Sequence, residues 1–153
     1  MIKLNIIAVG KLKEKFWVDA IAEYKKRISK YAELNVIECP EGVDEGNAQR
    51  LQAQEESGIL KKIKGYCVLL AIDGDAIKSE DLASMIEKES TKGNSEFSFI
   101  IGGSRGVSEG IRKRADKLIS FGRVTYPHQL MRVILSEQLY RAMTIINKTN
   151  YHK

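Results

Sequence analysis

Residues 66–72 read YCVLLAI and form the longest apolar run of the chain. The run shows no alternation of polar and apolar residues, which a strand with one solvent-facing side would have. A short run of this kind is typical of a strand buried on both faces, and such strands occur in parallel sheets that helices cover. We therefore expect a central parallel strand here. The dipeptide Asp73-Gly74 that follows predicts a turn.

On both sides of this run, expected strands and helices alternate along the chain. Hydrophobic patterning predicts strands at residues 2–10, 34–39, 97–101 and 117–122. It predicts helices at residues 16–29, 47–63, 79–92 and 129–148, with a short basic helix after Ser108. Asn47 and Ser79 are the expected caps of two of these helices. The order predicts an α/β fold with a mostly parallel sheet and helices on both faces, as a single domain over residues 1–153.

The composition narrows the classes of protein to consider. The 153 residues are 43% hydrophobic and 29% charged, and no apolar run approaches the length of a membrane span. Cys39 and Cys67 lie in separate apolar segments without a Cys or His partner at metal spacing, so we expect reduced, buried thiols, a cytoplasmic protein and no metal site. The net charge of +5 is compatible with nucleic-acid binding but does not establish it.

The loop GGSRG at residues 102–106 offers two interpretations. It matches G-x-S-x-G, the nucleophile elbow of serine hydrolases, and Asp116 and His128 follow Ser104 in the chain order of a catalytic triad. The chain is short for a hydrolase of that fold, however. In the second interpretation, the glycines let the backbone approach a ligand closely and offer it N–H donors.

The last expected helix is apolar around more than one stripe, which indicates burial on several faces. In so small a chain, we expect one face to pack on the sheet and another on a second copy, as in a two-fold homodimer. Within this helix Glu137 and Arg141 are four residues apart and face the same way. Pro127 is suited to begin the helix, and we expect His128 beside it to be neutral, holding the turn or lining a pocket.

Three segments carry a resemblance to a known family. These are FIIGGSRGVSE at residues 99–109, VTYPHQLMRVILSEQLYRAMTI at 124–145, and the terminal YHK. Together they resemble the ribosomal RNA large-subunit methyltransferase H family of small SPOUT methyltransferases, and the likeness covers the whole chain from IKLNIIAVGKLKE at residues 2–14 to the C-terminal tail. The resemblance implies an α/β fold with a C-terminal trefoil knot and S-adenosylmethionine as cofactor. It also implies a homodimer that acts on 23S rRNA in the assembled 70S ribosome, where the family methylates N3 of a pseudouridine in helix 69. A non-catalytic ribosome-binding dimer is the remaining alternative.

The resemblance also assigns residues to roles. The cofactor-binding residues that it implies are Leu70, Gly102, Gly103, Gly122, Arg123, Val124, Thr125, Tyr126 and Pro127. For the transfer itself, a cation beside the base would stabilise the anion that forms as N3 loses its proton. The catalytic candidates are Arg141 as that cation, Glu137 as its holder, and His152 as the base or as a partner that orients the base. The substrate-binding candidates are Tyr151 for stacking, with Arg132 and Lys153 for phosphates. Arg105 departs from the apolar residue that the family often carries after GGS.

Overall fold

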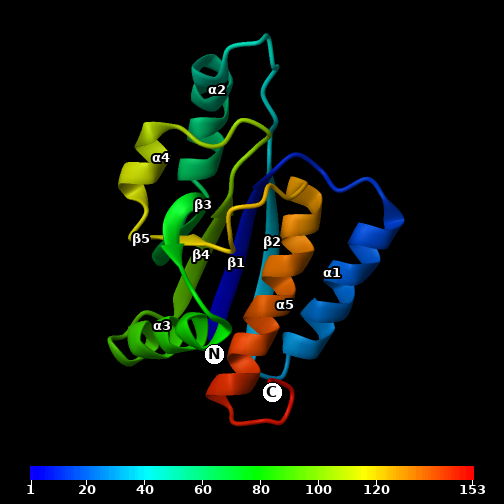
Figure 1. The fold of residues 1–153 in the computed structure, drawn as a ribbon, viewed down its shortest axis with the longest axis vertical. Coiled ribbons are helices and arrows are strands. Elements are labelled where there is room, and N and C mark those ends of the chain that lie inside the picture. The colour runs from blue at the N-terminus through cyan, green and yellow to red at the C-terminus, as the bar shows by residue number, and fades with distance from the viewer.

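A computed structural model describes all 153 residues and contains one five-stranded sheet in which every pair of neighbours is parallel. The order across the sheet is β2-β1-β4-β3-β5 (Figure 1). The strands are β1 (Ile2–Val9), β2 (Ala32–Cys39), β3 (Tyr66–Ala76), β4 (Glu96–Ile101) and β5 (Lys117–Ser120). The helices are α1 (Lys15–Ile28), α2 (Ala48–Leu60), α3 (Ser79–Thr91), α4 (Glu109–Arg114) and α5 (His128–Ile146). The predicted α/β fold is confirmed, whereas the threading of a knot stays a prediction.

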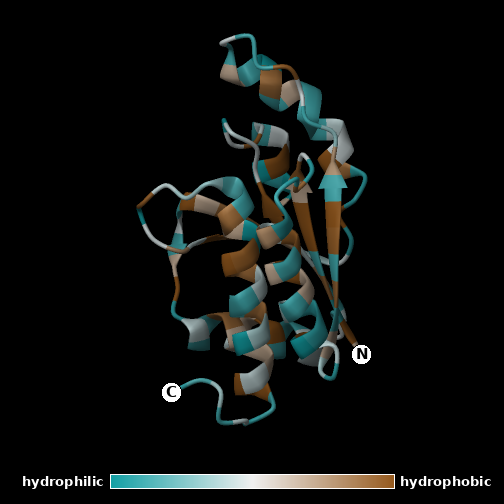
Figure 2. Ribbon diagram, turned by 90° about the vertical axis from the view of Figure 1, so that its right-hand side faces the viewer, coloured by the Kyte–Doolittle hydropathy of each residue, from teal (hydrophilic) through white to brown (hydrophobic).

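Helices cover both faces of the sheet and divide the core into two clusters. One cluster joins the strands to α1, α3 and α5, and the other joins them to α2 and α4. In β1 the side chains alternate between the clusters, since Ile6 belongs to the first and Ile7 to the second. The strands are accordingly mostly hydrophobic in Figure 2, whereas the helices show bands of both colours. The central run 66–72 lies in β3 between two neighbouring strands, as its composition predicts.

The predicted turn at Asp73-Gly74 is wrong, because β3 continues through it as a bulge. The pairing with β5 shifts register between Leu70 and Asp75, and Ile119 pairs with both of these residues. A Cβ atom on Gly74 would lie 2.8 Å from the backbone of Ile119, so only glycine fits where the two strands approach. The extra residues, Ala71 to Gly74, are displaced from the regular ladder, and this bulge forms part of the pocket wall described below.

Of the two predicted helix caps, Asn47 is confirmed and Ser79 is wrong. Asn47 accepts a hydrogen bond from the backbone N–H of Arg50, and Ser108 accepts one from that of Ile111. Ser79 is instead the first residue of α3. Lys78 holds the cap position there, and its N–H donates to Asp81 at 2.8 Å. The hydroxyl of Ser79 donates to Gln138 on α5 and so joins the two helices.

The course of α5 decides which residues can meet. All strands run in one direction, and α5 begins at their carboxyl ends and returns to their amino ends (Figure 1). The chain terminus therefore lies at the end of the molecule opposite the loops that follow the strands. No helix is long and apolar enough to span a membrane.

Candidate active site

A pocket of about 520 Å³ lies at the carboxyl ends of β3, β4 and β5. This volume falls in the range of small-molecule sites, and this edge is where parallel α/β sheets bind their ligands. Its walls are the bulge of β3, the GGSRG loop after β4, the loop after β5, and the first turn of α5. The pocket lies here because the parallel strands all end at the same edge of the sheet. Each buried strand is followed there by an irregular, partly exposed loop.

The structure brings eight of the nine expected cofactor-binding residues together in the lining of this pocket. They are Leu70, Gly102, Gly103, Gly122, Val124, Thr125, Tyr126 and Pro127. The ninth, Arg123, is exposed and is not part of the lining. The cofactor role of all nine stays a prediction, but eight of them now share one cavity.

The pocket also contains charged groups that sequence reasoning missed. Asp73 from the bulge and Arg112 from α4 line it and form an ion pair at 2.6 Å. The guanidinium of Arg112 lowers the pKa of the Asp73 carboxyl. In the sequence, Asp73 carried only a turn signal, and Arg112 was one of several surface charges. Nothing in one sequence marks two residues 39 positions apart as partners.

His128 lines the pocket from the first turn of α5, which is one of the two positions expected for it. Burial lowers the pKa of its imidazole, and the nearby positive charge of Arg132 lowers it further. The ring is therefore neutral at physiological pH and offers the pocket an apolar face with one N–H donor.

The arrangement of a serine hydrolase is absent. Asp116 does not bond to His128, because its carboxylate accepts a hydrogen bond from the backbone N–H of Cys67 at 2.8 Å. No hydrogen bond links Ser104 to His128. Arg105 is not part of the pocket lining and pairs with Asp44 at 2.9 Å. The loop therefore serves the cavity as a close-approaching wall rather than as a nucleophile elbow.

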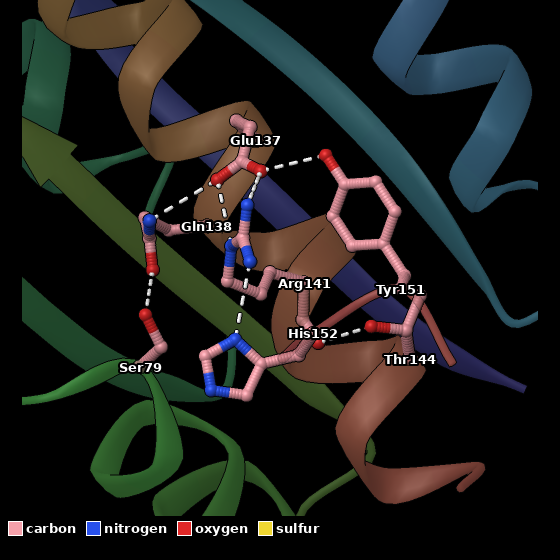
Figure 3. Close-up of polar contacts among 7 residues, drawn as sticks. All are labelled: Ser79, Glu137, Gln138, Arg141, Thr144, Tyr151 and His152. Carbon is pink, nitrogen blue, oxygen red and sulfur yellow. Dashed lines mark hydrogen bonds and ion pairs between the residues drawn. The ribbon is translucent and has the colours of Figure 1, made fainter. Parts of the chain in front are cut away.

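A second cluster of functional candidates lies at the other end of α5 (Figure 3). The two oxygens of Glu137 accept hydrogen bonds from Arg141, at 3.2 Å from Nε and 2.7 Å from Nη2. The hydroxyl of Tyr151 donates to Glu137 at 2.8 Å, and its ring lies 4.8 Å from the guanidinium carbon of Arg141. The hydrogen bonds that Arg141 donates to Glu137 raise the pKa of its guanidinium. The cluster thus holds a permanent cation in one orientation.

His152 also contacts Arg141, and this contact indicates which ring nitrogen of the neutral imidazole carries the proton. Arg141 Nη1 lies 3.1 Å from His152 Nδ1, and because arginine only donates, Nδ1 must accept. The proton of the neutral ring then sits on Nε2, which lies 3.5 Å from a carboxylate oxygen of Glu80. In this arrangement the Nδ1 lone pair is already used. The geometry therefore favours His152 as an orienting partner over His152 as the base.

Arg132 does not have the accessibility that a phosphate contact needs, and this expectation is wrong. Its side chain is 0% exposed. The guanidinium donates to Glu38 at 3.0 Å and to the carbonyl oxygens of Val9 and Gly10 at 2.8 and 3.0 Å. An arginine within the apolar stripe of a helix can either bind buried groups of the same protein or contact a phosphate. The sequence pattern does not distinguish these two roles. Lys153, by contrast, is exposed.

The pocket and the C-terminal cluster cannot form one site within a single protomer. Arg141 is 13 residues beyond His128 on the same helix, which at 1.5 Å per residue is roughly 20 Å. Figure 1 agrees with this, because α5 begins beside the loops at the carboxyl ends of the strands and the chain terminus lies beyond the other end of the helix. The structure therefore groups the predicted residues into two halves that face different ends.

Comparison with known proteins places this arrangement in a family. A model described as "Predicted SPOUT methyltransferase" matches residues 2–152. The chain is 48% identical to ribosomal RNA large subunit methyltransferase H of Limosilactobacillus reuteri, over 98% of this chain and 99% of that protein. The chain belongs to the ribosomal RNA large subunit methyltransferase H family. The homologue of the same name from Listeria monocytogenes is 45% identical over the same shares of both chains.

A solved structure supports the fold of this methyltransferase H family member independently of close sequence similarity. A probable methylase family protein from Haemophilus influenzae superposes with a TM-score of 0.54 at 12% identity. The match covers 95% of this chain, which spans 66% of the length of that protein. At this identity the likeness shows the shared fold alone. The family resemblance expected from the three sequence segments is thus confirmed, and the chain is a SPOUT methyltransferase.

Proposed function

We propose that this protein methylates N3 of a pseudouridine in helix 69 of 23S rRNA within the assembled 70S ribosome, with S-adenosylmethionine as methyl donor. We further propose that it acts as a homodimer in which the C-terminal cluster of one protomer completes the pocket of its partner. The observation that carries the dimer is the separation of roughly 20 Å between pocket and cluster along α5. The pocket and the C-terminal cluster lie at opposite ends of α5. If the α5 helices of two copies pack antiparallel, the cluster of each protomer lies beside the pocket of the other.

The exposed side of α5 supports such a pairing. Leu130, Val133 and Ile134 are only half-buried in one protomer, and Ile134 also lines an apolar groove of about 400 Å³ beside the pocket. In a two-fold pair of antiparallel helices centred on Ile134, residues equally far from the centre face each other. Arg141 is seven positions after Ile134, and Pro127 is seven before it. The partner's Arg141 therefore reaches the wall of this pocket.

The residues of the pocket fit the proposed cofactor. Apolar side chains and glycine backbone dominate the lining, which suits an adenine ring and a thioether chain. Asp73 and Arg112 supply the only full charges at neutral pH, as a zwitterionic amino-acid group requires. When bound, S-adenosylmethionine supplies an activated methyl group on its sulfonium. The chain's own task is then to hold the acceptor base in line and to favour its anionic form.

The C-terminal cluster is suited to stabilising the anionic form of the acceptor base. The imide N3 of a pseudouridine must lose its proton to attack, and a fixed cation beside the base stabilises the negative charge that results. Arg141 is such a cation, since Glu137 fixes its Nε and Nη2 while Nη1 faces His152. Tyr151 and His152 orient this guanidinium, and Tyr151 can also stack on a base that has left its helix. Lys153 is free to contact a phosphate.

Mixing two inactive variants tests the proposed dimer. Gly102→Val fills the pocket wall, since a Cβ there already lies 3.0 Å from Val107. Arg141→Ala removes the cation from the other half. Each variant alone should transfer almost no methyl group to 70S ribosomes. After denaturation and refolding together, half of the dimers are mixed and each has one intact composite site, so about a quarter of wild-type activity should return.

The readout is radioactive methyl incorporation into 23S rRNA, with the modified nucleotide located by mass spectrometry. No recovery on mixing would show that each protomer uses its own cluster. No labelling by the wild type, with intact ribosome binding, would favour the alternative of a non-catalytic ribosome-binding dimer. Ser104→Ala is the matched control on the pocket wall and should retain activity, because Ser104 has no assigned role in transfer.

A further inference from the structure

The loop between β1 and α1 presents an exposed aromatic and basic surface that the pocket and the cluster do not use. Lys11, Lys13 and Phe16 are exposed, and Phe16 keeps 63% of its surface accessible. The ring of Trp17 lies 4.8 Å from that of Phe16 at an angle of 59° and is half-buried beneath it. We call Lys11, Lys13, Phe16 and Trp17 the β1–α1 surface. A contiguous exposed apolar surface that charged residues border is a candidate interaction site.

The charges of this surface are available to a partner. Lys15 is neutralised by Asp19, at 2.6 Å. Lys11 and Lys13 form no ion pair, and the nearby Glu38 is already engaged by Arg132 and by the backbone N–H of Leu12. Glu14 is the only unpaired acid within the loop. The surface therefore keeps a positive excess that attracts phosphates.

The loop is held rigidly against the helix that begins at the pocket. Gly10 starts it with a φ of +84°, a left-handed turn that glycine adopts without strain. The guanidinium of Arg132 then ties the carbonyls of Val9 and Gly10 to α5, one turn after His128 in the pocket wall. The role of Arg132 in the structure is therefore to hold the β1–α1 loop against α5. A buried cation that fixes a loop relative to the pocket wall gives that loop a defined position beside the reaction.

We infer that the β1–α1 surface is a second RNA contact, which stacks an unpaired base on Phe16 and holds flanking phosphates with Lys11 and Lys13. The inference rests on the proposed function, because it takes rRNA as the substrate. An exposed ring with adjacent lysines matches the recognition of single-stranded RNA, in which bases stack on aromatics while cations follow the backbone. The surface lies at the same edge of the sheet as the pocket (Figure 1). It can therefore hold RNA next to the target loop.

Ribosome binding at varied salt tests this inference. We expect Lys11→Gln/Lys13→Gln to weaken the binding of 70S ribosomes about tenfold, and to reduce the slope of log affinity against log salt by about 1 to 2. Phe16→Ala should weaken binding about tenfold without changing that slope, since stacking releases no counterions. The matched control is Lys25→Gln/Lys26→Gln, which removes the same charge from the far end of α1, where both lysines are exposed. The control should bind within twofold of the wild type.

Each result decides between the alternatives. Wild-type binding by the Lys11/Lys13 variant, or equal weakening by the control pair, overturns the inference while leaving the methyltransferase proposal standing if the wild type labels 23S rRNA. A photoreactive benzoylphenylalanine at position 16 identifies the occupant. Cross-links to rRNA support the inference, and cross-links to a ribosomal protein or to a second copy overturn it. Unchanged calorimetric binding of S-adenosylhomocysteine shows that these variants remain folded.

Discussion

The two ends of α5 differ in how they are built. The pocket end is assembled from loops of four different segments, and most of its lining is apolar side chain or glycine backbone. The C-terminal end is assembled from the start of α3, the last turns of α5 and the terminal tail, and its polar groups form one continuous network from Ser79 to Tyr151 (Figure 3). The first arrangement suits the enclosure of a ligand. The second suits the fixing of a charge.

This difference shows how a short chain can divide binding from catalysis. A pocket of loops can close around a cofactor without placing a cation beside the methyl group. A network fixed on a helix can hold a cation with little reorganisation during the reaction. Because α5 separates them within one protomer, damage to one end should leave the task of the other end intact. The predictions below test that independence.

The largest effect should come from Arg141→Ala at the charged end. We expect the turnover number to fall about 10²–10³-fold, as on removal of one donor that stabilises an anion. Calorimetric affinity for S-adenosylhomocysteine should stay within twofold of the wild type, because Arg141 is not part of the pocket lining and acts on the acceptor base rather than on the cofactor. Loss of cofactor binding in this variant would break the division between the two ends.

The next effect should be on stability, from Arg132→Met near the pocket end. The substitution removes the only cation paired with Glu38, which keeps just the backbone N–H of Leu12 as a donor, and it removes the guanidinium donor from the carbonyls of Val9 and Gly10. We expect the free energy of unfolding in urea to fall by about 3 kcal/mol, since breaking a buried ion pair on one side strands its partner. Arg123→Met, at an exposed position, is the control and should change it by less than about 0.5 kcal/mol. Unchanged stability with weaker ribosome binding would restore the phosphate role first expected for Arg132.

Arg132 also illustrates what one sequence can and cannot predict. Strand and helix periodicity is local, so the alternation of elements and the parallel sheet follow from runs such as residues 66–72. The tie from Arg132 to Val9 and Gly10 spans more than 120 positions, and no local pattern carries it. A lone arginine in an apolar stripe has the same sequence signature whether it is buried or reaches for a phosphate.

In the candidate site, too, local contacts could be predicted from the sequence and long-range contacts could not. The pairing of Glu137 with Arg141 follows from their helical spacing, and the structure confirms it. Asp73 lies in a bulge of β3, and the close approach of β5 to this bulge leaves room only for glycine at position 74. The dipeptide Asp73-Gly74 is typical of a turn, so the local sequence predicted a turn where the structure has a strand. Tertiary pairing overrode the local preference there.

A smaller effect should come from Tyr151→Phe, which removes one hydroxyl from the charged network. Its O–H donates to Glu137 at 2.8 Å, and without it the carboxylate is less firmly placed against Arg141. We expect the turnover number to fall about fivefold to tenfold, corresponding to a hydrogen bond of about 1 kcal/mol. The Michaelis constant for ribosomes should stay nearly unchanged, since the ring remains for stacking. Tyr151→Ala should raise that constant as well, and equal behaviour of the two variants would contradict a separate positioning role for the hydroxyl.

The smallest effect should come from Ser104→Ala on the pocket wall. Ser104 is exposed and bonds to neither His128 nor Asp116, so its hydroxyl has no base to activate it. A pocket that binds through its glycine backbone and apolar side chains does not depend on this oxygen. We expect turnover and cofactor affinity within twofold of the wild type, measured by methyl incorporation and by calorimetry. A large loss of turnover would mean that the GGSRG loop does chemistry of its own, and that the pocket end is more than a place of binding.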